Sequence, residues 1–289
     1  MYQNGEFSLV NICSVPRSMS TILEISLAEI FDAQVNEVFN RGQSDLEVAS
    51  KSILDILNEK RKAYGKFILI TKNISSEIAE TNYLSLLEVS DLLIFTIRDP
   101  LIQTASLIER VGNDKLSKRG AAKLSFEDLL ANGDFLDTVF ADRYNFVRNG
   151  WEDLYSRYKI AQNSGKKTII IDGTLLCIQP QFYILEISKL MNRDFNENAI
   201  SNWTKASQEN FNNPNHYDFD YDENRISKNK WVSDANRSIS FKKNLRDKPQ
   251  MSVFMENFPR TANYITEIAF PIYRKLQSSD NFMSHRSIN

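Results

Sequence analysis

The stretch FSLVNICSVPRSMST, residues 7–21, decides how this chain is interpreted. Its first nine residues form a mostly apolar run, which predicts a strand that is buried on both faces. The six residues after it, from Pro16 to Thr21, combine a proline, an arginine and three hydroxyl side chains. A helical pattern follows, in which Leu23, Leu27 and Ile30 fall at i, i+4 and i+7 and make one apolar stripe. The stretch therefore predicts a strand, a polar loop and a helix in direct succession.

Similar apolar runs recur along the chain and alternate with helical patterns. The further runs are 33–39, 66–72, 91–97 and 167–172, and the helix candidates are 18–32, 44–63, 75–89 and 99–111. This order predicts an α/β fold with three layers and a central, mostly parallel sheet. The Asp99-Pro100 pair is typical of the cap and first residue of a helix, and it opens the candidate at 99–111.

The rest of the chain is predicted to be mainly helical. Helical patterns cover 113–163, 180–192 and 255–278, and Pro271 should kink or end the last of them. The polar stretch 207–236 has no clean period and is interpreted as a loop or a substrate lid. We expect one domain over 1–289, with a core at about 7–242, helical insertions, and a C-terminal helical segment at about 250–280.

Composition excludes several classes of function. The 289 residues include 35 Lys+Arg and 37 Asp+Glu, a net charge of −2, which argues against a protein that coats nucleic acid or anionic membrane. Only His216 and His285 are available for histidine chemistry, and no glycine motif of the common nucleotide-binding kinds is present. No apolar run is long enough for a membrane span, no signal peptide is expected, and the two cysteines do not make a disulfide framework. We therefore expect a cytoplasmic protein.

Two strand-to-helix junctions carry the candidate chemistry. Helix N–H groups, the guanidinium of Arg17 and the hydroxyls of Ser18, Ser20 and Thr21 would together bind an anion. At the end of the run 91–97, Arg98 precedes a helix on which Ser106 can face the same crevice, together with Gln103 three residues before it. A capped helix with a surface arginine, and a strand-end arginine in a salt bridge, are the alternatives without function.

Together these junctions resemble the sulfotransferase superfamily, whose donor is 3′-phosphoadenosine 5′-phosphosulfate (PAPS). The family loop commonly reads P-R-S-G-S-T, and Pro16-Arg17-Ser18-Met19-Ser20-Thr21 is closest to a branch that reads P-R-S-M-S-T. A strand-end arginine with a serine eight residues later is matched by Arg98 and Ser106. Weaker similarities extend the match over about 7–242, among them Asn36-Glu37-Val38, Lys72-Asn73-Ile74 and Ile170-Ile171-Asp172.

The resemblance implies a P-loop-like fold and transfer of a sulfuryl group from PAPS to a hydroxyl or amine of a small-molecule acceptor. Residues 17–21, with Met19 among them, would hold the 5′-phosphosulfate, and Arg98 with Ser106 would hold the 3′-phosphate. No metal, nucleic acid or membrane span is expected, and the sequence does not set the acceptor or the oligomeric state. Because Met19 replaces the usual glycine, we expect the loop to adopt a conformation that a side chain tolerates.

Glu37 is the candidate base, since carboxylates at this place act as the base in several relatives. Apolar neighbours on its strand would raise its pKa, although a salt bridge to Arg41 or Lys72 is the alternative. Lys72 would assist the leaving group or neutralise Glu37, and Asp172 would orient either of them. The basic C-terminal triplet of many family members is absent, with Lys242, Lys243 and Arg246 as possible substitutes.

Two other functions stay open from the residues alone. An ATP-dependent, kinase-like transferase would need a magnesium carboxylate, for which Asp172 is the nearby candidate. A non-catalytic nucleotide-binding protein would retain the fold without turnover.

Overall fold

A computed structural model describes residues 7–31, 33–36, 67–76, 78–116, 123–142, 150–201, 241 and 247–284. Within them lies a five-stranded sheet in the order β2-β3-β1-β4-β5, in which every neighbouring pair is parallel. The strands are β1 (Phe7–Ser14), β2 (Ala33–Asn36), β3 (Phe67–Ile74), β4 (Leu92–Ile97) and β5 (Thr168–Asp172). The sequence prediction of an α/β fold with a parallel sheet is confirmed.

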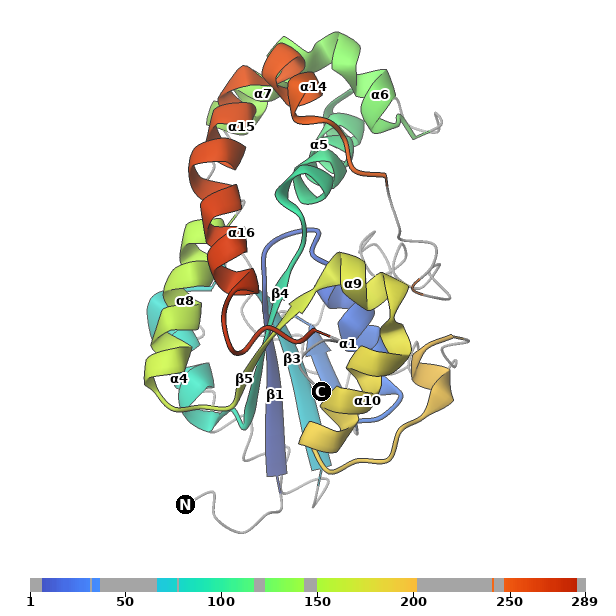
Figure 1. Ribbon diagram of the computed structural model, residues 1–289, viewed down its shortest axis with the longest axis vertical. Helices are drawn as coiled ribbons and strands as arrows, with labels where there is room; N and C mark the ends of the chain where they lie inside the picture. Colours follow the sequence, from blue (N-terminus) through green and yellow to red (C-terminus); the bar gives the residue numbers. More distant parts are fainter. Residues whose placement is uncertain are drawn as a thin grey trace, which may run out of the picture.

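Helices cover both faces of this sheet (Figure 1), which makes three layers. One face carries α1 (Ser20–Ala28), α9 (Gly173–Ile178) and α10 (Pro180–Leu190), followed by the short 3-10 turn η3 (Glu197–Ala199). The opposite face carries α4 (Glu80–Val89), α8 (Trp151–Asn163) and α16 (Phe270–Gln277). Because both faces are covered, the strands are continuous apolar runs, and every residue of β4 is buried.

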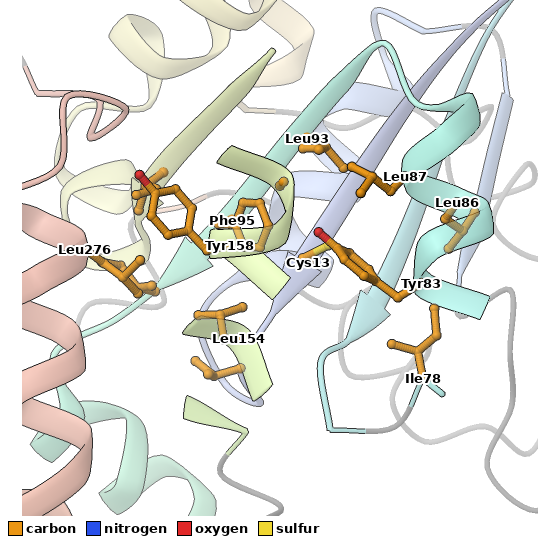
Figure 2. Packing of buried hydrophobic residues seen from close by; sticks show 14 of the residues in the cluster. Cys13, Ile78, Tyr83, Leu86, Leu87, Leu93, Phe95, Leu154, Tyr158 and Leu276 are labelled. Carbon is orange, nitrogen blue, oxygen red and sulfur yellow. The ribbon is translucent and has the colours of Figure 1, made fainter. Parts of the chain in front are cut away.

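The core on the α4/α8 face is built largely from aromatic and aliphatic side chains (Figure 2). Phe95 of β4 packs edge-on against Tyr158 of α8, with the ring centroids 5.5 Å apart. Tyr83 lies beside Cys13, and its hydroxyl donates to the carbonyl of Arg157 at 2.8 Å. Burial raises the pKa of the Cys13 thiol to about 12, so this cysteine is a neutral core residue.

A third cluster of helices lies beyond the carboxyl ends of the strands (Figure 1). It consists of α5 (Pro100–Leu116), α6 (Phe126–Leu129), the 3-10 turn η1 (Leu130–Asn132), α7 (Gly133–Asp142), α14 (Met251–Asn257) and α15 (Pro259–Tyr264). The buried Asp137 links α7 to α15, because its carboxylate accepts the backbone N–H groups of Arg260 and Thr261 at 2.9 and 3.0 Å. This cluster overhangs the sheet edge at which the candidate site was predicted.

Proline interrupts the C-terminal helix as expected. Between α15 and α16 the chain forms a π-helical stretch, η5 (Ile265–Ala269), and Pro271 is the second residue of α16, which follows it. Since proline has no N–H and its ring crowds the preceding turn, the regular α-helical ladder does not continue through this point. After α16 the chain returns to the sheet, where Phe282 forms a parallel bridge with Ile170 of β5.

Several boundaries differ from the sequence prediction, among them the end of α1 at Ala28 instead of 32 and the end of α5 at Leu116 instead of 111. Strand β3 continues to Ile74, α4 begins only at Glu80, and α9 follows β5 directly where no helix was predicted. The predicted helix at 44–63 and the polar stretch 207–236 lie outside the described residues, as do both histidines. No helix among the described residues combines the length and apolar character that crossing a membrane requires.

Candidate functional site

The site lies where strands β1 and β4 end side by side. The chain leaves β1 toward β2 on one side of the sheet and leaves β4 toward β5 on the other side. Neighbouring strands whose connections diverge in this way create a crevice at their carboxyl ends, and ligands of open α/β sheets bind in such crevices. The loop that contains Arg17 follows β1, and Arg98 follows β4, so the topology brings the two predicted junctions together.

The backbone of the loop has an unusual alternating conformation. Arg17 has φ 66° and Met19 has φ 73°, both in the left-handed region, whereas Ser18 between them is not left-handed. Each left-handed non-glycine residue costs on the order of 1–3 kcal/mol and requires support from its surroundings. An alternation of this kind turns successive N–H groups toward one concavity, an arrangement found in phosphate-binding loops. The expectation that Met19 would impose a conformation tolerated by a side chain is therefore wrong.

Ser18 ties the loop to the sheet. Its hydroxyl donates to the carbonyl of Val15 at 2.8 Å and lies 2.7 Å from the hydroxyl of Thr96 at the end of β4. The side chain is fully buried. These bonds occupy the Ser18 hydroxyl inside the protein. An anion at the loop would therefore be bound by the backbone N–H of Ser18 and not by its hydroxyl.

Two arginines link the loop to α5 and to the end of β4. The guanidinium Nε of Arg17 donates to the Ser106 hydroxyl at 3.0 Å, and Nη1 of Arg98 lies 3.4 Å from the Arg17 carbonyl. Arg17 is half-buried, whereas Arg98 is only 1% exposed. The structure therefore brings Arg17, Arg98 and Ser106 together as predicted, but Ser106 bonds Arg17 rather than Arg98.

Gln103 provides a further contact one helical turn before Ser106. Its Nε2 donates to the Pro16 carbonyl at 2.8 Å, and its Oε1 accepts the indole N–H of Trp151 at 3.4 Å. Trp151 is the first residue of α8 and is fully buried. The sequence placed Gln103 on the same helix face as Ser106, but it gave no sign of the distant Trp151.

Lys72 lies on the other side of the loop. The residue is 3% exposed, and its Nζ donates to the Thr21 hydroxyl in the first turn of α1 at 3.3 Å. In the sheet, Lys72 pairs with Asn36, the last residue of β2. Glu37 follows Asn36 in the sequence and lies outside the described residues, so its proposed role as the base stays a prediction.

Asp172 ends β5 and is engaged on both carboxylate oxygens. Oδ1 accepts the backbone N–H groups of Thr174 and Leu175 at 2.7 and 3.3 Å and so caps α9, while Oδ2 accepts the hydroxyl of Tyr273 at 2.6 Å. Burial raises the pKa of Asp172 above its ordinary value, although these hydrogen bonds oppose the shift. These bonds tie the carboxylate to α9 and α16, which is a different role from the predicted orientation of Glu37 or Lys72.

The residue after Asp172 touches the loop itself. A Cβ atom on Gly173 would lie 2.4 Å from the Ser18 carbonyl oxygen and 3.0 Å from Cγ of Met19. Only a residue without a side chain allows α9 to begin this close to the loop. Four site residues were missed by sequence reasoning, namely Thr96, Trp151, Gly173 and Tyr273. A glycine directly after a strand-end aspartate, in a chain with nine glycines, is nevertheless a usable signal.

The described residues contain no group of three or more histidine, cysteine, aspartate or glutamate side chains that could hold a metal ion. Cys177 in α9 lies near Arg98, yet burial raises the pKa of its thiol to about 11. It is therefore a neutral residue and not a nucleophile. The chemistry of the described site is that of cations, hydroxyls and backbone N–H groups.

Comparison with known proteins gives structural likeness only. No protein-family model matches the chain, and no curated protein matches its sequence. The structure is similar to a sulfotransferase domain from the curacin biosynthetic pathway, with a TM-score of 0.39 and 10% identity over 90% of this chain and 97% of that one. It is also similar to mouse sulfotransferase SULT7A1 complexed with PAP, with a TM-score of 0.42 and 12% identity over 90% of this chain and 88% of that one. Both scores are low, so the residue assignments have to come from the site itself.

Proposed function

We propose that this protein is a sulfotransferase that moves a sulfuryl group from PAPS to a hydroxyl or amine of a small-molecule acceptor. The observation that carries the proposal is the backbone of residues 15–19, directly before α1, in which Arg17 and Met19 are left-handed. The Arg17 guanidinium is held at this loop by Ser106. Backbone N–H groups and a half-buried guanidinium suit a phosphosulfate, because charge-assisted hydrogen bonds to an anion are the strong ones.

In the proposed reaction the acceptor oxygen or nitrogen forms a bond to sulfur, and the bond from sulfur to the 5′-phosphate oxygen breaks. The electron pair stays on that phosphate oxygen, where Arg17 and the loop N–H groups would stabilise the developing charge. Lys72, which reaches the first turn of α1 through Thr21, is placed on the same side of the sheet edge and would assist the leaving group. Glu37 would accept the acceptor's proton, and Arg98 with Ser106 would hold the 3′-phosphate of the donor.

A cytoplasmic location is part of the proposal. Both cysteines are free and buried, which suits a reducing compartment. The competing ATP-dependent function would need Asp172 as a magnesium ligand, and its oxygens already accept hydrogen bonds from α9 and Tyr273.

The proposal is tested first by ligand binding. PAP, the desulfo product of PAPS, should raise the melting temperature without magnesium, by about 5–10 °C at a hundredfold excess over its Kd. Arg17→Ala should remove most of this shift, whereas Arg274→Ala, which deletes an exposed arginine of α16, should retain it. A larger shift with magnesium and ATP than with PAP would favour the kinase-like function instead.

Turnover is tested with labelled PAPS and a panel of hydroxyl and amine acceptors. Formation of a labelled product establishes the transferase. Binding of PAP with no transfer to any acceptor, and no hydrolysis of PAPS, would support a nucleotide-binding protein that lacks turnover.

A further inference from the structure

Three consecutive carbonyl groups of the loop are held from outside it. The Pro16 carbonyl accepts Nε2 of Gln103 at 2.8 Å, and the Arg17 carbonyl lies 3.4 Å from Nη1 of Arg98. The Ser18 carbonyl is packed against Gly173, so closely that a Cβ there would be 2.4 Å away. The groups that hold these carbonyls come from α5, from the end of β4 and from the start of α9.

Holding a carbonyl also fixes the direction of an N–H group. In a planar trans peptide the C=O and the following N–H point in opposite directions. Because the Pro16 carbonyl is turned toward Gln103 on α5, the N–H of Arg17 is turned away from that helix. The same reasoning turns the N–H of Ser18 away from Arg98. The direction of the N–H groups is thus set by side chains that need not touch the ligand.

Gln103 is well suited to this task. It is fully buried, and both ends of its amide are used, since Nε2 donates to Pro16 and Oε1 accepts from Trp151. The Thr104 hydroxyl also donates to Oε1 at 3.4 Å, so the indole and this hydroxyl together fix which end of the amide faces the loop. Ser106, three residues later on α5, accepts Nε of Arg17, so one helix face holds two adjacent residues of the loop.

We infer that Gln103 is a positioning residue for the anion loop, which keeps the Arg17 N–H aimed at the bound anion by holding the Pro16 carbonyl. The inference rests on the anion-binding part of the proposed function and does not depend on the acceptor or on the base. It accounts for the direction of the buried amide, whose Nε2 donates to Pro16, and for a loop conformation that would otherwise be costly.

The test replaces Gln103 with methionine, which has a similar shape and does not donate to Pro16. The probes are PAP and inorganic pyrophosphate, which need the loop, and 3′-AMP, which carries only a 3′-phosphate. We expect Gln103→Met to weaken PAP and pyrophosphate binding roughly tenfold, the value of one hydrogen bond, and to change 3′-AMP binding less than twofold. A role limited to stability would not separate the two kinds of ligand.

Asn257→Leu is the matched control, because its amide also donates to a backbone carbonyl, that of Val253 at 2.9 Å, in α14 of the third cluster. It should lower the melting temperature without changing any of the three affinities. If Gln103→Met does not fold, Trp151→Phe, which removes the indole N–H from Oε1 and leaves the Thr104 hydroxyl as its donor, should give a smaller loss with the same selectivity. Unchanged pyrophosphate affinity in the variant that folds would overturn the inference.

Failure of the proposed function gives a different result. If the native protein binds pyrophosphate but not PAP, the sulfotransferase proposal fails while the pyrophosphate comparison still decides the role of Gln103. If it binds neither, the loop is not an anion site and both proposals fail.

Discussion

Gly173→Ala tests whether the start of α9 sets the shape of the loop. The added Cβ would lie 2.4 Å from the Ser18 carbonyl oxygen, whereas real Cβ atoms essentially never approach closer than 3.0 Å, so the contact must open by at least 3.0 − 2.4 = 0.6 Å. The obstructing atom belongs to the backbone of a loop that is fixed on its other side by Ser18 and Gln103, so it does not move freely. Overpacking of this kind costs about 1–3 kcal/mol.

A shift of this size also matters for function, because binding constellations need to be held within about 0.5 Å of their productive geometry. We therefore expect Gly173→Ala to weaken PAP at least tenfold and to slow transfer by up to about a hundredfold, the loss that a misplacement of about 1 Å can cause. Calorimetric titration with PAP and initial rates with labelled PAPS measure the two effects.

Gly165→Ala is the control for general destabilisation. Gly165 has φ +69°, so alanine is strained there, yet a Cβ would meet nothing within 4 Å. It should cost about 1 kcal/mol of stability and leave PAP binding unchanged. If Gly173→Ala binds PAP and turns over like the native protein, the close approach of α9 does not determine the loop geometry, and the reasoning is refuted.

Three further predictions concern the loop, the base and the buried aspartate. Met19→Gly should be more stable than Met19→Ala by about 1 kcal/mol in urea unfolding, because the left-handed backbone at this position reverses the usual helix order of the two residues. Glu37→Gln should lower transfer by about 10²–10⁴ with PAP affinity unchanged, and transfer at the native rate would make Lys72 the next candidate base. Burial raises the pKa of Asp172 above 3.8, so the folded state holds its proton more tightly than the unfolded state. The free energy of unfolding should then fall as the pH rises from about 4 through that raised pKa, and Asp172→Asn should remove this part of a urea-unfolding pH series.

The fold could be predicted because the strands are covered on both faces and therefore stand out as continuous apolar runs. The prediction ended β3 too early because Asn73 is polar, yet in the sheet its amide donates to Asn11 of β1 at 3.1 Å. A cross-strand pair of this kind has no local pattern. Helix α9 was missed because its six residues are too short to show a period, although Asp172 is a typical N-cap.

The candidate site was predictable only in part, for a related reason. Arg17 and Arg98 could be found because each lies next to its own strand-to-helix junction in the sequence. The partners that shape the loop come from far along the chain, with Gln103 and Pro16 separated by 87 positions and Tyr273 and Asp172 by 101. Only the folded chain brings them together, which is why Ser106 was assigned to Arg98 and is instead bonded by Arg17.

At this site the glycine is Gly173, which faces the loop, and the left-handed loop position itself carries Met19. Met19 is left-handed although it carries a side chain, so the loop does not itself supply the freedom that a glycine would give. The facing residue supplies the space instead, since Gly173 admits both the Ser18 carbonyl and the Met19 side chain. The strain at Met19 is thus supported by two contacts to the loop just before it, from Gln103 at Pro16 and from Gly173 at Ser18. A loop held in this way keeps its N–H groups in place before any ligand binds, and such preorganisation lowers the cost of binding a charged group.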